Sequence, residues 1–367
     1  MDSNKIKISS RQLGILLIVT IVGVGILTLP REVSEIAGTD GWILIILGGI
    51  ASILMSLVIH TLSMRFPNQT IIEYSEELLG RPLSILIGII IFTYCSMFAA
   101  FSVRIFGEVL KMFLLPKTPI EVITITFLLT AGYLVRNGLE PIVRFYELII
   151  MIMFIPYLLA LFAGTSNVNF TNLLPVFQTS PRVLLKGSFQ IIFSYIGFEF
   201  IFLLFPFVSD QKNIRKTLLI SISSIILLYL ITNIFVLATF GEDTIESLIW
   251  PLMAYIKSIE IPGGFIEQLE GIIMTIWVLF IYTTLSTVYF LSSFTLSRVM
   301  NVKEHSFFVS LLLPVIHILS LLPDNVAQLY DWLGIFSFYG STLVSVIIPS
   351  FLLLVAKVRK KGEKANG

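Results

Sequence analysis

The chain has 367 residues, of which 56% are hydrophobic and only 13% are charged, and its formal net charge is +1. Because ordinary soluble domains carry about a quarter charged residues, this composition excludes an ordinary soluble protein and indicates a chain that lies mostly in a membrane. The single cysteine, Cys95, excludes an intrachain disulfide framework.

Ten apolar segments follow one another along the chain, each close to or above the roughly 20 residues that cross a bilayer. We therefore predict an all-α integral membrane protein with ten transmembrane helices, which form a single membrane domain over residues 1–367. The predicted spans are 10–37, 41–64, 83–113, 119–136, 141–163, 184–207, 217–240, 271–296, 306–322 and 326–355.

The Lys and Arg residues are concentrated in the N-terminal lead, in the loops after even-numbered spans and in the C-terminal tail. Cytoplasmic loops carry an excess of these residues, and an even number of spans puts both termini on one side. We therefore expect both termini in the cytoplasm. The basic tail that ends the chain is also expected to contact anionic lipids of the bilayer.

Spans one to five (10–163) and spans six to ten (184–355) form two halves joined by a polar segment. Because five is odd, span six crosses in the opposite direction to span one, which is the geometry of an inverted repeat. Apart from glycines inside the first span of each half, the halves show no residue-level similarity. The predicted repeat therefore follows from topology.

The first span reads VTIVGVGILTLP, with Gly23 and Gly25 inside an apolar run and Pro30 about a turn later. Helix breaks in lipid are tolerated only where they face protein or a wet cavity. We predict that the helix unwinds at these glycines, which would free amides near Gly25 and Ile26 for a ligand carboxylate. The alternative is a face of small residues where helices pack closely.

The third span carries two pairs of residues at helical spacing. Tyr94 and Phe98 are four apart and are expected to face the centre of the bundle, either at a ligand or in ordinary packing. Arg104 and Glu108 are also four apart, and they predict a salt bridge, with an outer gate as the alternative.

The sixth span reads IIFSYIGFEFIFLLFP and predicts a second break, at Gly197. Tyr195 and Phe198 can close over a small ligand, and carbonyls freed by the break can accept from an ammonium group. Glu199 follows two residues later, and an ionisable group at membrane depth is a functional hypothesis by default. The alternative is a carboxyl group satisfied by neighbouring hydroxyls.

The eighth span holds a cluster of hydroxyl groups that includes Thr284. These groups can ligate a substrate or a sodium ion together with carbonyls of span one, or they can bond to their own helix; the sequence leaves both interpretations open. The cluster consists of Tyr282, Thr283, Thr284, Ser286 and Thr287.

Nothing in the sequence resembles a catalytic set. His60, His305 and His317 lie on separate segments, and none has the spacing to acidic residues that metal or catalytic motifs require. No nucleophile, base and orienting group occur together. We therefore expect no enzymatic activity, no metal site, no nucleic-acid partner, and no cofactor beyond a coupled proton or sodium ion.

Two strings resemble a known superfamily. GVGILTLPREVSEIAGTDGW resembles the first-span signature of the amino acid/polyamine/organocation transporters, and SYIGFE resembles their sixth-span signature. More narrowly, GILTLPR with an early DGW, FLLPKTPIEVI, LIWP and GGFIEQLE together are similar to the B subunit of spore nutrient germinant receptors. This narrower likeness covers almost the whole chain.

The resemblance implies a LeuT-like fold of five plus five helices, with discontinuous helices one and six and an amino-acid-sized ligand near the bilayer midplane. It also implies the inner membrane of a bacterial spore and two partners, a larger A subunit and a lipoprotein C subunit. The site residues that it implies are Gly23, Val24, Gly25, Ile26, Tyr94, Phe98, Tyr195, Gly197, Phe198, Glu199 and Thr284.

These observations lead to one functional hypothesis and one rival. The chain is expected to sense a small nutrient, most simply an amino acid, which binds between spans one, three, six and eight. Binding would bias a conformational equilibrium that partner subunits detect. The rival is a proton- or sodium-coupled amino acid transporter.

Overall fold

The structure is a computed structural model that describes residues 7–259 and 269–362. The GGFIEQLE stretch (263–270) lies almost entirely outside these residues, and so does the side chain of Val24. The described chain is helical apart from turns and one isolated parallel bridge, between Ile8 and Val208. The expected all-α class is therefore confirmed.

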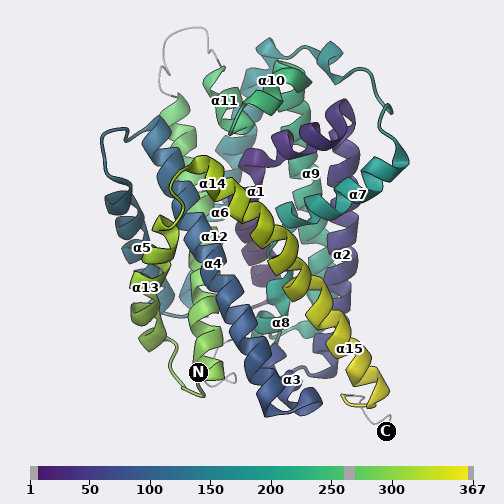
Figure 1. Cartoon of the computed structure of the whole chain (residues 1–367), viewed down its shortest axis with the longest axis vertical. Coiled ribbons are helices and arrows are strands. Elements are labelled where there is room, and N and C mark those ends of the chain that lie inside the picture. Colours follow the sequence, from purple (N-terminus) through teal and green to yellow (C-terminus); the bar gives the residue numbers. More distant parts are fainter. Residues whose placement is uncertain (1–6, 260–268, 363–367) are drawn as a thin grey trace.

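The helices fall close to the ten predicted apolar segments (Figure 1). The longer ones are α1 (Ser10–Ala37), α2 (Gly41–Arg65), α4 (Arg81–Phe113), α5 (Ile120–Arg136), α6 (Leu139–Ala163), α9 (Ile214–Phe240), α12 (Leu269–Val299) and α13 (Ser306–Leu321). Short helices are α3 (Ile71–Leu79), α7 (Pro181–Ile191), α8 (Ile201–Leu204), α10 (Glu242–Ser247) and α11 (Pro251–Lys257). The last segment comprises α14 (Val326–Ile335), the π-helix η8 (Phe336–Ile347) and α15 (Ile348–Val358).

Single turns of 3₁₀-helix connect several of these elements. They are η1 (Gly38–Asp40), η2 (Gly164–Asn167), η3 (Phe170–Leu173), η4 (Ile192–Tyr195), η5 (Phe198–Phe200), η6 (Phe205–Phe207) and η7 (Gln211–Asn213).

Within the described residues, six helical stretches are long and apolar enough to cross a membrane. They are Gly25–Arg65, Arg81–Phe113, Leu139–Ala163, Gln211–Phe240, Met274–Val299 and Val326–Val358. Three shorter apolar stretches accompany them: Ser10–Gly23, which is the first part of α1, Phe198–Phe207 and Ser306–Leu321. A membrane-spanning bundle is thus supported, while the count of ten spans and the five-plus-five repeat stay predictions.

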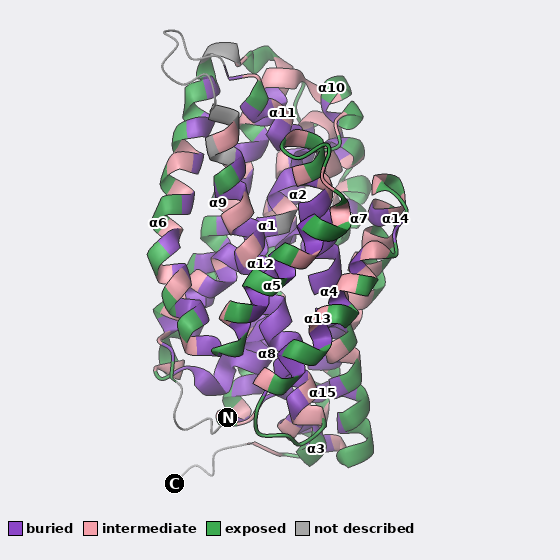
Figure 2. Ribbon diagram, turned by 90° about the vertical axis from the view of Figure 1, so that its left-hand side faces the viewer, coloured by how far each residue is buried: buried purple, intermediate pink, exposed green. Residues whose placement is uncertain are grey.

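The centre of the bundle is formed by α1 and α12. α1 packs against α9, α12 and α6, and α12 packs against α4. Figure 2 shows buried residues concentrated in these inner helices and in α8, whereas exposed residues lie on outward faces of helices such as α6 and α13. Many outward residues are large and apolar, for example Leu148, Leu159 and Val358. An apolar exterior of this kind is what a lipid environment requires.

The predicted break in the first span is wrong, because α1 is one continuous helix that includes Gly23, Gly25 and Pro30. A Cβ atom on Gly23 would overlap Thr284 Oγ1 and lie 2.6 Å from the carbonyl oxygen of Phe280. These glycines therefore allow close helix packing, which was the alternative interpretation. Because Gly25 and Ile26 lie in mid-helix, their amides are not freed for a ligand carboxylate.

The predicted break in the sixth span is confirmed. α7 ends at Ile191 and continues into η4, and the chain then turns at Gly197, where φ is +127°. This backbone conformation favours glycine, because a Cβ atom would be strained there. After the break, η5, α8 and η6 carry the chain to Phe207.

The last helical segment connects two regions of the molecule. Its middle part, η8, has 12 residues, whereas π-helices in proteins are mostly single turns that often mark functional sites. Beyond α15, Arg359 Nη1 donates to the carbonyl oxygen of Leu78, and Lys361 Nζ donates to that of Glu77 at 2.6 Å. Both carbonyls belong to the C-terminal turn of α3, where cationic donors are favourable.

Candidate functional site

A cavity of about 610 Å³ lies beside the break in the sixth span. Its volume falls in the range of sites that bind small molecules. The walls come from α1, α4, the α7–η4 segment and the α14–η8 segment. The lining residues are Ile21, Gly25, Thr28, Glu32, Glu35, Ile36, Phe98, Gln190, Ile191, Ser194, Ile196, Tyr330, Leu333, Gly334, Ile335, Phe336, Ser337, Phe338 and Tyr339.

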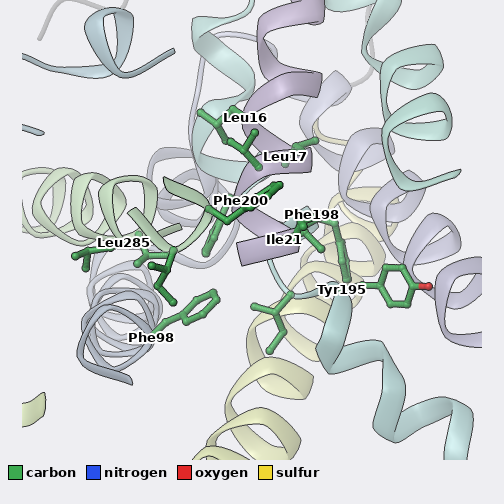
Figure 3. Packing of buried hydrophobic residues seen from close by; sticks show 14 of the residues in the cluster. Leu16, Leu17, Ile21, Phe98, Tyr195, Phe198, Phe200 and Leu285 are labelled. Atoms are coloured by element: carbon green, nitrogen blue, oxygen red, sulfur yellow. The ribbon is translucent and has the colours of Figure 1, made fainter. Parts of the chain in front are cut away.

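Two of the predicted site residues, Gly25 and Phe98, line this cavity. Figure 3 shows Ile21 on α1 and Phe98 on α4, while the Tyr195 ring points away from both. The Tyr195 hydroxyl donates to the carbonyl oxygen of Ile45 in α2, at 2.8 Å. Ile26 and Phe198 are buried and do not line the cavity.

Tyr94, Gly197 and Glu199 form a hydrogen-bonded cluster behind the cavity wall. The Tyr94 hydroxyl donates to Glu199 Oε1 at 2.8 Å, and the Gly197 N–H donates to Oε2 at 2.8 Å. Glu199 is fully buried, so these donors satisfy a carboxyl group that has no access to solvent. The Tyr94 ring also stacks on Phe336, which lines the cavity, with ring centroids 5.1 Å apart. The cluster thus links the cavity wall to the break.

Thr284 lies at the contact between α12 and α1, away from the cavity lining. Its hydroxyl donates to the carbonyl oxygen of Thr20 at 2.8 Å, and the Thr283 hydroxyl donates to that of Val19 at 3.0 Å. Both hydroxyls also donate to the carbonyl oxygen of Phe280 in their own helix. The hydroxyls thus bond both to carbonyls of α1 and to their own helix.

Acidic and metal-ligating residues are otherwise dispersed. In the part of the chain that the structure describes, no three His, Cys, Asp or Glu residues are grouped as a metal site would require.

The salt bridge predicted between Arg104 and Glu108 is confirmed, at 2.8 Å. Arg104 also donates to the carbonyl oxygen of Ser320, so this pair joins α4 to α13.

Sequence reasoning missed Glu32, which is the less exposed of two acidic residues that line the cavity. Its carboxylate accepts from Thr28 Oγ1 at 2.6 Å and from Ser194 Oγ at 3.0 Å, and it thereby connects α1 to η4. The four-residue spacing of Thr28 and Glu32 on one helical face was a usable signal. The wall from α14 and η8, by contrast, carries no sequence signal beyond aromatic residues such as Tyr330 and Phe336.

Comparison with known proteins identifies the family. The family model described as spore germination protein (spore permease) matches residues 7–329. The chain is 33% identical to spore germination protein YndE of Bacillus subtilis (strain 168), over 99% of this chain and 100% of that protein. It is 26% identical to spore germination protein GerLB of Bacillus cereus, over 97% of this chain and 96% of that protein.

Solved structures show the fold. MhsT in complex with L-phenylalanine has a TM-score of 0.64 at 13% identity, over 95% of this chain and 88% of that one. A substrate-bound, outward-open Na⁺-coupled sialic acid symporter has a TM-score of 0.66 at 13% identity, over 99% of this chain and 92% of that one. The fold is thus that of LeuT-like transporters. The chain is a multi-pass membrane protein and belongs to the spore germination protein family.

Proposed function

We propose that the chain is the nutrient-sensing subunit of a spore germinant receptor. It would lie in the inner membrane of the spore with both termini in the cytoplasm, beside an A subunit and a lipoprotein C subunit. Membership of the spore germination protein family supports this role. The described chain is a helical bundle, so a partner would have to convert binding into a response.

The observation that carries the proposal is the cavity beside the broken sixth span. It combines an apolar wall that includes Phe98 and Ile196 with polar groups such as Ser194, as small-molecule sites do. An amino acid is the proposed ligand class, and MhsT, which shares the fold, is complexed with L-phenylalanine in its structure. The site would lie between the first, third, sixth and tenth predicted spans; the tenth replaces the eighth of the sequence hypothesis.

A ligand in this cavity would contact several separate elements of the bundle. It would touch Gly25 of α1, Ile196 at the break and Phe336 of η8. The stacking of Phe336 on Tyr94, and the hydrogen bond from Tyr94 to Glu199, extend those contacts to the broken segment. Binding can shift the equilibrium between two arrangements only by its different affinity for them.

The test disturbs the cavity wall at Gly25. A Cβ atom on Gly25 would lie 2.9 Å from the carbonyl oxygen of Ser194, another lining residue, so Gly25→Phe is expected to displace the wall and abolish the nutrient response of spores. Gly132→Ala is the matched control, because its Cβ atom would meet Tyr289 at an ordinary 3.6 Å. The amount of assembled protein is measured by immunoblot of spore membranes.

Phe98→Ala is a second variant, in case Gly25→Phe fails to assemble. It enlarges the cavity without overlap and should raise the nutrient concentration for half-maximal germination. A normal dose–response curve in assembled Gly25→Phe or Phe98→Ala protein would show that the ligand binds elsewhere.

A coupled amino acid transporter is the second candidate. The LeuT-like transporter fold and the buried carboxyl group of Glu199 at the break favour it. Proteoliposomes separate the two candidates. Accumulation of labelled amino acid against a gradient, driven by protons or sodium, indicates transport, whereas saturable binding without flux indicates sensing.

A further inference from the structure

The cavity has an unbalanced set of charged residues. Among the described residues that line it, Glu32 and Glu35 are acidic, and none is Lys, Arg or His. Glu35 is exposed, and its Oε1 forms an ion pair with Arg31 at 2.6 Å, which offsets its charge. Glu32 therefore determines the charge that a ligand in the cavity meets.

The recorded partners of the Glu32 carboxylate are neutral. Thr28 Oγ1 donates to Oε1, and Ser194 Oγ donates to Oε2. Burial disfavours the charged carboxylate, and donation to both oxygens offsets part of that effect. A carboxylate at an apolar cavity is costly without a counter-charge, and a cation in the cavity would remove part of that cost.

The wall opposite α1 suits the same kind of ligand. The lining has five aromatic residues: Phe98, Tyr330, Phe336, Phe338 and Tyr339. Ring faces attract ammonium groups, and their apolar area also accommodates an aliphatic or aromatic body. A carboxylate without an ammonium group gains only the apolar contact, and Glu32 repels it.

We infer that the cavity selects its ligand by positive charge, and that Glu32 is the specificity-determining residue. The ligand class is a primary ammonium compound with an apolar body; amino acids belong to it through their ammonium group, and the carboxylate is dispensable. This inference rests on the proposed function, because it assigns the recognition group within the same cavity. A ligand bound to Glu32 of α1 would also affect η4, because Ser194 of η4 donates to the Glu32 carboxylate.

The test uses the purified full-length protein in lipid nanodiscs and three matched sets of probes. The sets are L-alanine, ethylammonium and propionate; L-leucine, isoamylammonium and isocaproate; and L-phenylalanine, phenethylammonium and hydrocinnamate. Dissociation constants are obtained from the rise in melting temperature with probe concentration. In at least one set, the amino acid and the ammonium compound should both bind and the carboxylate should not.

Glu32→Gln should weaken the binding of that ammonium compound by roughly 10- to 100-fold, as expected for the loss of a hydrogen bond to a charged group. Glu121→Gln is the control, because this exposed acidic residue in the first turn of α5 does not line the cavity, and it should leave binding unchanged. The selectivity of the unaltered protein tests the inference even if Glu32→Gln does not fold.

Three results would overturn the inference: a carboxylate that binds as tightly as its ammonium counterpart, no binding by any ammonium compound, or unchanged affinity in folded Glu32→Gln. Each leaves the proposed function intact if Gly25→Phe still abolishes the nutrient response of spores. A normal response in assembled Gly25→Phe protein would instead contradict the proposed function itself.

Discussion

The first and sixth spans carry glycines in similar apolar runs, yet α1 is continuous and the sixth span is broken. The difference lies in what surrounds each backbone. At the break, the Gly197 N–H donates to Glu199 Oε2, and the Ser194 carbonyl oxygen accepts from the Tyr229 hydroxyl at 2.9 Å. In α1, Gly23 instead lies against Thr284 and Phe280 of α12.

A helix in lipid can open only where other groups take over its hydrogen bonds. At the sixth span a carboxyl group accepts from a freed amide, whereas the hydroxyls of Thr283, Thr284 and Tyr229 beside α1 donate to carbonyls. The glycines of α1 give close packing instead. Glycine in a membrane helix therefore permits either outcome, and the neighbouring side chains decide which one occurs.

The largest expected effect that tests this comparison comes from Gly197→Ala. An alanine at φ +127° is strained, and its Cβ atom would lie 2.8 Å from Ile21 Cγ1. We expect a loss of about 3 kcal/mol of unfolding free energy, measured in mixed detergent micelles. Gly132→Ala, which lies within α5, serves as the control. Equal stability of the two variants would mean that the break does not depend on Gly197.

Gly23→Ala tests the close packing of α1, the continuous helix of the comparison. The added methyl group would overlap Thr284 Oγ1 and approach the Phe280 carbonyl oxygen, so overpacking should cost about 2 kcal/mol. Adding Thr284→Ala removes the first overlap and keeps the second, and it should restore part of the stability. If Gly23→Ala is as stable as the unaltered protein, α1 is not held this closely against α12.

The smallest expected effect concerns the hydrogen bonds between the start of α1 and the turn that follows the sixth span. The Ser10 N–H and hydroxyl both donate to the Asp210 carboxylate, at 2.6 Å each. Burial alone would raise the pKa of Asp210, but the Ser10 hydroxyl, the Asn213 amide and the Ser10 N–H hold this pKa below its usual value. Asp210 lies in the turn between η6 and η7, outside the apolar helices.

Because the folded-state pKa is depressed, this carboxylate contributes stability above the unfolded pKa of about 3.9, and the contribution is lost as pH falls through the lower folded value. The melting temperature of the unaltered protein should therefore fall more steeply from about pH 5 to about pH 3 than that of Asp210→Asn. Parallel curves would show that this connection adds nothing to stability.

The sequence predicted the helical segments well, because length and hydropathy determine where apolar helices begin and end. It also predicted the break at Gly197 and the Arg104–Glu108 pair, since both depend on residues close in the chain. The continuity of α1 depends on contacts with Thr284, which is remote in sequence, so the local pattern could not decide it. For the same reason, the contribution of η8 to the cavity was not predicted.

One continuous helical run begins at the cavity and ends against α3. Phe336 forms part of the cavity wall, and past α15 Arg359 and Lys361 donate to carbonyls of α3. A ligand that displaces the backbone at Phe336 would alter the winding of η8 or shift α15 lengthwise against α3. If the π-helix is stiff, ligand binding in the apolar interior shifts α15 against α3 at the polar surface of the protein. If it is flexible, the change stays within η8.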